Sequence, residues 1–198
     1  MVNFPSRPAL VVIDVQNGFR IAPYSEMEVF PPLESVIATI STILQEFRAS
    51  SLPVIHVYHD SLEDDSPLRK GCPDGYAVIP EAAAIKDEII FVKNVNSGFI
   101  GTGLEAHLRD AKIDTLVILG LTTSHCVSTT TRMAGNLGFK VFVPRDGTAM
   151  FERSAAPGNT RRFDAETMHE VALSELHEEF ATVVTAKEII DGLKSHAV

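Results

Sequence analysis

Three side chains of complementary chemistry each follow a short apolar run in this sequence: the carboxylate of Asp14, the ammonium of Lys93 and the thiol of Cys126. A carboxylate near a thiol can accept its proton, and a neighbouring ammonium stabilises both anions. The thiolate formed in this way is the form of cysteine that attacks carbon. Together these residue types indicate a nucleophilic thiol that is supplied with its own base.

Cys126 stands at the start of a predicted helix. Residues 116–119 have the length and branching of a buried strand, Gly120 ends that run, and the three hydroxyl residues at 122–124 are typical of a helix N-terminus. The unpaired backbone N–H groups and the positive end of the helix dipole at such a position favour a thiolate and predict a low thiol pKa. The alternative is that Cys126 is a small apolar side chain filling the core.

Asp14 and Lys93 each have a simpler explanation when taken singly. An Asp after a strand often caps a turn, and a Lys can lay its stem along apolar surface with its ammonium in water. Both residues nevertheless end apolar runs, ALVVID and IIFVK. Because ligands bind at the carboxyl ends of the strands in open parallel sheets, chemistry at one sheet edge explains both residues.

Strands and helices are predicted to alternate along the chain. Continuous apolar runs indicate strands that are covered on both faces, and apolar residues at spacings of three and four indicate amphipathic helices. The predicted strands are residues 9–14, 53–59, 89–92, 116–119, 140–143 and 181–184, and the predicted helices are residues 33–50, 104–111, 124–137, a helix capped by Asp164, and residues 186–193. This order predicts one domain over residues 1–198, an α/β fold with a parallel sheet between two layers of helices.

Composition excludes several classes of protein. The formal net charge is −9 and no cluster of Lys and Arg stands out, so a nucleic-acid partner is not expected. No apolar run approaches the roughly 20 residues that span a bilayer, and the N-terminal sequence lacks a signal-peptide pattern, so we expect a cytoplasmic protein. In that reducing setting Cys72 and Cys126 are not expected to form a disulfide, and Cys72 is interpreted as a bystander.

Three segments of the chain resemble the isochorismatase-like cysteine hydrolases: ALVVIDVQNGF, FVKNVNSGFIGTGLEAHLRDAKIDTLVILGLTTSHCVSTTTRMAGNLGFKVFV and DGTAMF. That family includes nicotinamidases, N-carbamoylsarcosine amidases, ureidoacrylate amidohydrolases and streptothricin hydrolases. The resemblance extends from about Pro8 to Glu188. It implies a Rossmann-like fold with a six-stranded parallel sheet, and a catalytic triad formed by Asp14, Lys93 and Cys126.

The resemblance also implies a cis peptide bond between Leu121 and Thr122. Its implied use is to aim the backbone N–H of Thr122, together with that of Cys126, at an oxyanion. The reaction we infer is acyl transfer, in which Asp14 takes the thiol proton and the thiolate attacks a carbonyl carbon. Asp14 then protonates the departing nitrogen, and water hydrolyses the thioester.

Departures from the family patterns narrow the substrate. His56 and His59 lie three apart on a predicted strand and so point to opposite faces, and no later His completes a metal site. We therefore expect no metal, no other cofactor and no nicotinamidase activity. Family members that cleave a vinyl ether usually lack the cysteine, so Cys126 favours C–N hydrolysis of a carboxamide, ureide or lactam over ether hydrolysis.

Six residues near the predicted strand ends could line a pocket for a small-molecule substrate. Aromatic residues there are as often ordinary core, and the polar residues beside Asp14 could bind substrate or simply close the loop. The candidates are the aromatic residues Phe19, Tyr24, Phe99 and Phe151 and the polar residues Gln16 and Asn17.

His125 adjoins the candidate nucleophile, but consecutive helical side chains point about 100° apart, so it is expected to support the site or contact another subunit rather than act as the base. The segment from Ser154 to Arg162 is predicted to be a solvated loop. Its alternative is a mobile lid on which Arg161 or Arg162 meets an anionic substrate.

Two functions of other classes remain open from the sequence alone. A thiol redox protein could use Cys126 against oxidants, because a low thiol pKa serves that chemistry too. A non-enzymatic scaffold could retain the fold and bind a partner. The family resemblance also implies a homodimer or homotetramer.

Overall fold

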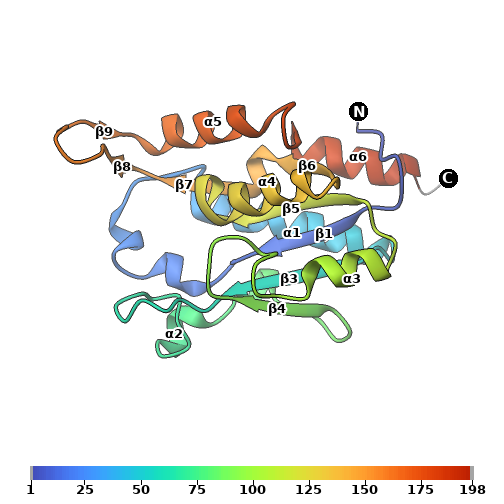
Figure 1. Cartoon of the computed structure of the whole chain (residues 1–198), viewed down its shortest axis with the longest axis horizontal. Coiled ribbons are helices and arrows are strands. Elements are labelled where there is room, and N and C mark those ends of the chain that lie inside the picture. Colours follow the sequence, from blue (N-terminus) through green and yellow to red (C-terminus); the bar gives the residue numbers. More distant parts are fainter. Residues whose placement is uncertain (1, 197–198) are drawn as a thin grey trace.

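In a computed structural model that describes residues 2–196, a parallel sheet runs through the molecule and helices cover both of its faces (Figure 1). Six strands lie in the order β10-β6-β5-β1-β3-β4, each parallel to its neighbours. They are β1 (Ala9–Ile13), β3 (Val54–His59), β4 (Ile89–Lys93), β5 (Thr115–Leu121), β6 (Lys140–Pro144) and β10 (Thr182–Val184). The predicted three-layer α/β/α architecture is confirmed.

The sheet has eight strands, two more than the sequence predicts. β5 pairs with β6 only as far as Val117, and beyond that point β7 (Thr148–Phe151) pairs with the end of β5. β2 (Val29–Phe30) then adds to β7 in the antiparallel sense. Strands of four and two residues are too short to give a periodic signal, which is why the sequence does not reveal them.

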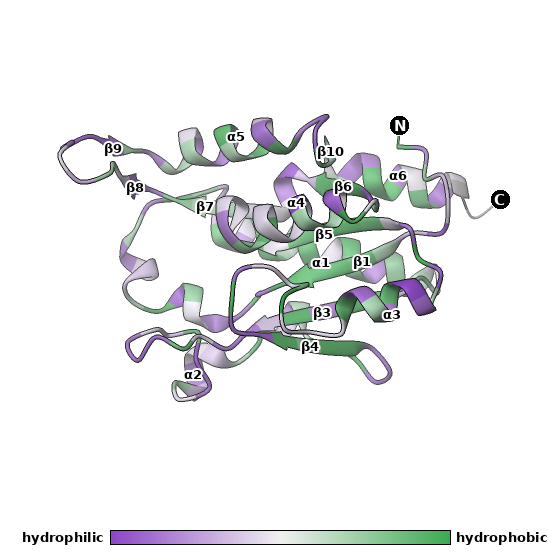
Figure 2. Cartoon of the chain, in the orientation of Figure 1, coloured by the Kyte–Doolittle hydropathy of each residue, from purple (hydrophilic) through white to green (hydrophobic). Residues whose placement is uncertain are grey.

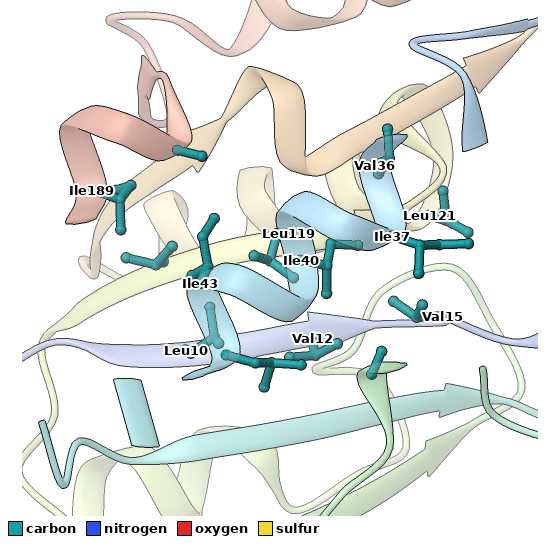
Figure 3. Packing of buried hydrophobic residues seen from close by; sticks show 14 of the residues in the cluster. Leu10, Val12, Val15, Val36, Ile37, Ile40, Ile43, Leu119, Leu121 and Ile189 are labelled. Atoms are coloured by element: carbon teal, nitrogen blue, oxygen red, sulfur yellow. The ribbon is translucent and has the colours of Figure 1, made fainter. Parts of the chain in front are cut away.

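Alternation along β1 divides the core between two layers of helices. Leu10 and Val12 face α1 (Leu33–Ala49) and α6 (Ala186–His196), and Figure 3 shows the isoleucines of α1 packed over these strand residues. The intervening residues of β1 face the opposite layer of α3 (Leu104–Asp110), α4 (Ser128–Asn136) and α5 (Ala165–Leu176). Figure 2 shows the consequence, since the inner strands are mostly apolar while the helices also carry polar residues.

The strand order reverses at β1, which lies between β5 and β3. The register pairs Ile13 with Gly120 and His59 with Lys93, so the carboxyl ends of β1, β3, β4 and β5 share one edge of the sheet. This is the position where open α/β sheets bind ligands.

Two shorter features complete the fold. α2 (Pro73–Tyr76) interrupts the polar segment after β3. β8 (Arg153–Ser154) and β9 (Arg162–Phe163) form an antiparallel hairpin, so the segment predicted to be a loop is the turn of a hairpin that projects from the body of the molecule (Figure 1).

No helix within residues 2–196 is long and apolar enough to cross a bilayer.

Candidate active site

A buried ion pair joins the ends of β1 and β4. Asp14 follows β1 directly with a φ of 52°, in the left-handed region that Asp tolerates better than most residues. Its Oδ2 accepts a hydrogen bond from Lys93 Nζ at 2.6 Å, and neither side chain is exposed to solvent. Because each charge would be costly to bury alone, the two residues depend on one another.

His59 is a third member of this group. From the sequence it was considered only as a metal ligand, and that role was argued against. As the last residue of β3 it stands beside Lys93 in the register, and its Nδ1 lies 2.9 Å from Lys93 Nζ. An ammonium can only donate, so Nδ1 accepts and the proton of the neutral imidazole lies on Nε2. Burial lowers the pKa of His59, and the charge of Lys93 lowers it further. Its position at the carboxyl end of a predicted strand is the feature of the sequence that could have identified it as a site residue.

Cys126 lies in a π-helical turn, Thr123–Val127, that precedes α4. The predicted α-helix from residue 124 is therefore wrong over its first turn, where the backbone N–H groups of His125 and Val127 both donate to Thr122 O. The turn brings the thiol close to Asp14 and His59, since one ligand atom from each of the three residues lies within 4.8 Å of the others.

One oxygen of Asp14 is free to act on that thiol. While Oδ2 binds Lys93, Oδ1 is buried and has no hydrogen-bond partner among the residues that the structure describes. A buried acceptor without a partner is rare in proteins and calls for an explanation. The neighbouring thiol, and a substrate bound beside it, supply one.

The pKa of the Cys126 thiol is raised, so the low value predicted from a helix N-terminus is wrong. Burial is the main cause, and the charge of Asp14 adds to it, while Lys93 acts in the opposite direction. Burial also raises the pKa of Asp14, against the effect of Lys93. The sequence could not show this, because it gives the position of the cysteine along the helix but not its depth.

The peptide bond between Leu121 and Thr122 is cis, as the family resemblance implies. It follows Gly120, whose φ of +125° is a conformation that other residues rarely adopt. A Cβ at this position would lie 2.0 Å from the carbonyl oxygen of Ile13, so only glycine lets β5 approach the end of β1 so closely. Thr122 and Cys126 both line the cavity described next.

A cavity of about 350 Å³ opens in front of the thiol. Three of the four predicted aromatic residues form one wall: the ring of Tyr24 lies 5.0 Å from that of Phe19 and 5.1 Å from that of Phe151, measured between centroids. The lining residues are Phe19, Pro23, Tyr24, His59, Ser61, Glu63, Asp65, Ser66, Pro67, Leu68, Asn96, Thr122, His125, Cys126, Phe151 and Arg153.

Phe99 does not line this cavity, contrary to the prediction. It is buried in the core beneath α3 and α4, where its ring stacks on that of Phe139 with 6.0 Å between centroids. An aromatic residue in a loop near a strand end can turn toward either the core or the site, and the sequence does not distinguish the two.

Gln16 and Asn17 are likewise absent from the lining, and Gln16 closes the loop instead. Its amide donates to the carbonyl oxygens of His59 and Tyr76 at 3.1 and 3.0 Å, and its Oε1 accepts from the backbone N–H of His59 at 2.8 Å. Gln16 thus holds the backbone of His59 in place. Asn17 Oδ1 accepts a long hydrogen bond, 3.5 Å, from Arg20.

Another part of the cavity wall comes from the polar segment after β3, for which the sequence predicted no role. Residues 61–68 turn back over the strand ends and supply six of the lining residues. Their polar, Pro-containing sequence predicts an irregular segment but not where that segment folds.

His125 also lines the cavity, and within residues 2–196 no hydrogen bond joins its ring to Asp14 or to the thiol. Its Nε2 lies 3.0 Å from a guanidinium nitrogen of Arg153, and its Nδ1 lies 3.0 Å from Ser124 Oγ and 3.2 Å from Thr122 Oγ1. These contacts agree with the predicted supporting role. Arg161 and Arg162, the arginines considered for a lid, are not among the lining residues.

Asp14, His59 and Cys126 are together a plausible ligand set for a metal ion. The Lys93 ammonium, however, already lies 2.6 Å from Asp14 and 2.9 Å from His59, where it would repel a cation. His56, as predicted, points to the opposite face of the sheet, with its Nε2 2.8 Å from Glu88 Oε2.

A model of the isochorismatase domain matches residues 8–188. The chain belongs to the isochorismatase family. The uncharacterized isochorismatase family protein YrdC of Bacillus subtilis is 40% identical over 193 residues, which cover 96% of this chain and 98% of that protein. The family predicted from the three sequence segments is thereby confirmed.

Two further isochorismatase-family comparisons bear on fold and chemistry. The crystal structure of a family protein from Chromobacterium violaceum has a TM-score of 0.90 at 36% identity and covers 98% of this chain and 97% of its own. The N-carbamoylsarcosine amidase of an Arthrobacter species is 29% identical over 163 residues, which are 73% of this chain and 60% of that enzyme. The chain is accordingly an isochorismatase-family hydrolase.

Proposed function

We propose that the chain is a cysteine-dependent hydrolase that cleaves a C–N bond adjoining a carbonyl group in a small molecule. The observation that carries this proposal is the position of Asp14. One of its oxygens is held by Lys93 at 2.6 Å, and the other is buried, without a partner among the described residues, close to Cys126. A carboxylate placed in this way can take the thiol proton and later return it.

The reaction begins with a protonated thiol, in keeping with the raised pKa of Cys126. Lys93 favours the ionised form of Asp14, and this form accepts the thiol proton as the sulfur attacks the substrate carbonyl carbon. The backbone N–H groups of Thr122 and Cys126 stabilise the tetrahedral oxyanion, an interaction whose loss typically costs about 10²- to 10³-fold in rate.

The tetrahedral adduct then collapses and the C–N bond breaks. Asp14 gives its proton to the departing nitrogen, which leaves as an amine or ammonia, and the acyl group remains on Cys126 as a thioester. A water molecule gives a proton to Asp14 and attacks the thioester, so that a carboxylic acid leaves and the thiol is restored. Atoms and protons balance over the two halves of the cycle.

Two further observations support C–N hydrolysis of a small substrate. A cavity of about 350 Å³ is at the lower end of the usual range for small-molecule sites, and its aromatic wall can hold an apolar or planar group beside the thiol. The Arthrobacter relative is, by its name, an amidase that acts on N-carbamoylsarcosine. A thiol redox protein is less well supported, because sensor thiols have low pKa values and that of Cys126 is raised.

The test is a panel of carboxamides, ureides and lactams, assayed for release of ammonia or amine with three proteins: the natural chain, Cys126→Ala and Cys72→Ala. We expect the natural chain and Cys72→Ala to hydrolyse the same substrate at similar rates, since Cys72 does not line the cavity. Cys126→Ala should be folded and inactive. Hydrolysis by Cys126→Ala at the natural rate would overturn the proposal.

A further inference from the structure

Arg153 brings a positive charge into the cavity that no carboxylate neutralises. It is the first residue of β8, two positions after the end of β7, and because side chains alternate along an extended segment, Phe151 and Arg153 face the cavity while Glu152 points away. Glu152 pairs with Arg162 at 2.8 Å. Arg153 itself forms no ion pair within 4.0 Å among residues 2–196.

We propose that Arg153 binds a carboxylate on the substrate, so that the substrate is a small carboxylic acid carrying the scissile amide or ureide at its other end. This inference rests on the proposed function, because it assigns a further residue of the same cavity. Arg is suited to the role, since its planar fork of N–H donors matches the two oxygens of a carboxylate.

His125 fixes the guanidinium in place without cancelling its charge. Arg153 Nη2 donates to Nε2 of His125 across 3.0 Å, so that nitrogen is an unprotonated acceptor and the ring is neutral. Burial lowers the pKa of His125, and the charge of Arg153 lowers it further, which keeps the ring neutral near pH 7. The remaining donors of the guanidinium are therefore available to a ligand.

Arg153 and Tyr24 line the same cavity, so the anion subsite adjoins the aromatic wall. Burial raises the pKa of the Tyr24 hydroxyl, and Arg153 is near enough to oppose that rise. Both residues line the cavity together with Cys126. A substrate carbonyl at the thiol and a carboxylate at Arg153 would leave the apolar middle of the molecule against Tyr24 and the neighbouring rings.

Two acidic residues of the cavity lining favour the opposite preference, for a cationic substrate. Glu63 and Asp65 both belong to the lining and would attract a cationic substrate. Both are exposed on the segment after β3, where water and salt screen their charges. Arg153 is exposed as well, but it differs from them in being held by a defined hydrogen bond to His125. Arg153 should therefore dominate, and the experiment includes a cationic substrate to decide the point.

The experiment compares monoamides of dicarboxylic acids, from malonamate to adipamate, with neutral amides in which a methyl group replaces the carboxylate, and with 4-aminobutanamide as the cation. The natural chain should show a higher kcat/KM for at least one acid than for its neutral partner. Arg153→Gln should lower kcat/KM for that acid by about 10- to 100-fold, as expected for a lost charge-assisted hydrogen bond, and change the neutral amide by less than about twofold.

Two variants serve as controls. Arg161→Gln removes an arginine of the projecting hairpin that stacks on Phe163 and does not line the cavity, and it should leave the ratio between acid and neutral amide unchanged. Arg153→Lys keeps the charge without the planar fork and should restore part of the preference. An equal loss for both substrates in Arg153→Gln, or a preference for the cationic amide in the natural chain, would overturn the proposal.

A binding measurement distinguishes failure of this inference from failure of the proposed function. Calorimetric titration of Cys126→Ala with succinamate and glutaramate should show binding that disappears in Cys126→Ala/Arg153→Gln. If binding depends on Arg153 but the natural chain hydrolyses no amide, the anion subsite stands and the hydrolase proposal fails. If amides are hydrolysed with no dependence on Arg153 in binding or rate, the hydrolase proposal stands and the anion subsite is wrong.

Discussion

The two carboxylate oxygens of Asp14 lie in different surroundings, and this difference explains how one residue can serve as base and then as acid. Oδ2 is held by Lys93, which favours the ionised form of the group against the effect of burial, and Oδ1 is left without a partner among the described residues. A base whose two oxygens were both satisfied would have to break a hydrogen bond before it could take a proton. The site is therefore organised around one free acceptor next to a partly buried thiol.

The pH dependence of the reaction follows from burial of that carboxyl group. Burial raises the pKa of Asp14 above its ordinary value, and only the ionised form can take the thiol proton. Hydrolysis should therefore fall as the pH is lowered, and kcat/KM should show an acidic limb at a pH above the pKa of about 3.9 of an unperturbed Asp. A kcat/KM profile that stayed flat down to pH 4 would contradict this assignment.

The π-helical turn that contains Cys126 is joined to neighbouring elements by a chain of buried hydrogen bonds. His169 on α5 lies 3.1 Å through Nε2 from the carbonyl oxygen of Arg145, so its Nδ1 accepts from Thr123 Oγ1 at 2.9 Å. Thr123 Oγ1 in turn lies 3.0 Å from Thr148 Oγ1 on β7. Thr123 begins the π-helical turn, so this chain joins the turn to α5 and β7.

Two substitutions of His169 separate positioning of the turn from simple packing. In His169→Asn the amide oxygen can replace Nδ1 and still accept from Thr123, whereas in His169→Gln the amide nitrogen can replace Nε2 and donate only to Arg145 O. We expect kcat to fall by about tenfold or more in His169→Gln, which corresponds to a rise of roughly 1.4 kcal/mol in the activation free energy. KM should be nearly unchanged, and kcat should partly recover in His169→Asn. Equal kcat values in the two variants, with equal losses of thermal stability, would show that the contact is structural only.

The sequence predicts those elements whose formation depends on local pattern. The strand of residues 9–14 and the helix of residues 33–50 were predicted within a residue or so of β1 and α1, because their apolar residues face a core along their whole length. The π-helical turn, β2 and β7 were missed, since they form only where distant segments meet. The raised pKa of Cys126 and the orientation of Phe99 toward the core were missed for the same reason.

At the scale of the whole molecule, the sheet brings four strand ends to one edge. The segments that follow β1, β3 and β4 close the cavity over these strand ends. On the opposite side of β3, a partly buried cluster of charged side chains anchors the segment that leads into β4. Glu88 accepts two hydrogen bonds from Arg48 on α1, at 2.8 and 2.9 Å, and lies 2.8 Å from His56. This cluster ties helix α1 to the edge of the sheet.

The Glu88 cluster should contribute to stability in a pH-dependent way. Burial alone would raise the pKa of Glu88, but Arg48, the Ile85 N–H and His56 lower it from 4.5 to about 2. A lowered carboxyl pKa stabilises the fold above the unfolded pKa, and that stability is lost as the pH falls from about 4.5 toward 2. Glu88→Gln should therefore lower the free energy of unfolding by about 3 kcal/mol at pH 7, and the difference should shrink progressively below pH 4.5. Urea unfolding of both proteins across this range measures it, and a difference independent of pH would be inconsistent with the ion pair.

The most direct test of the central claim is the rate of Asp14→Asn on the best substrate from the amide and ureide panel. Asparagine keeps the size of the side chain but cannot take the proton of Cys126, so kcat should fall by about 10²- to 10⁴-fold, the usual contribution of a general base. Circular dichroism should confirm that the variant is folded. A folded Asp14→Asn variant that hydrolyses the substrate at the natural rate would contradict the account.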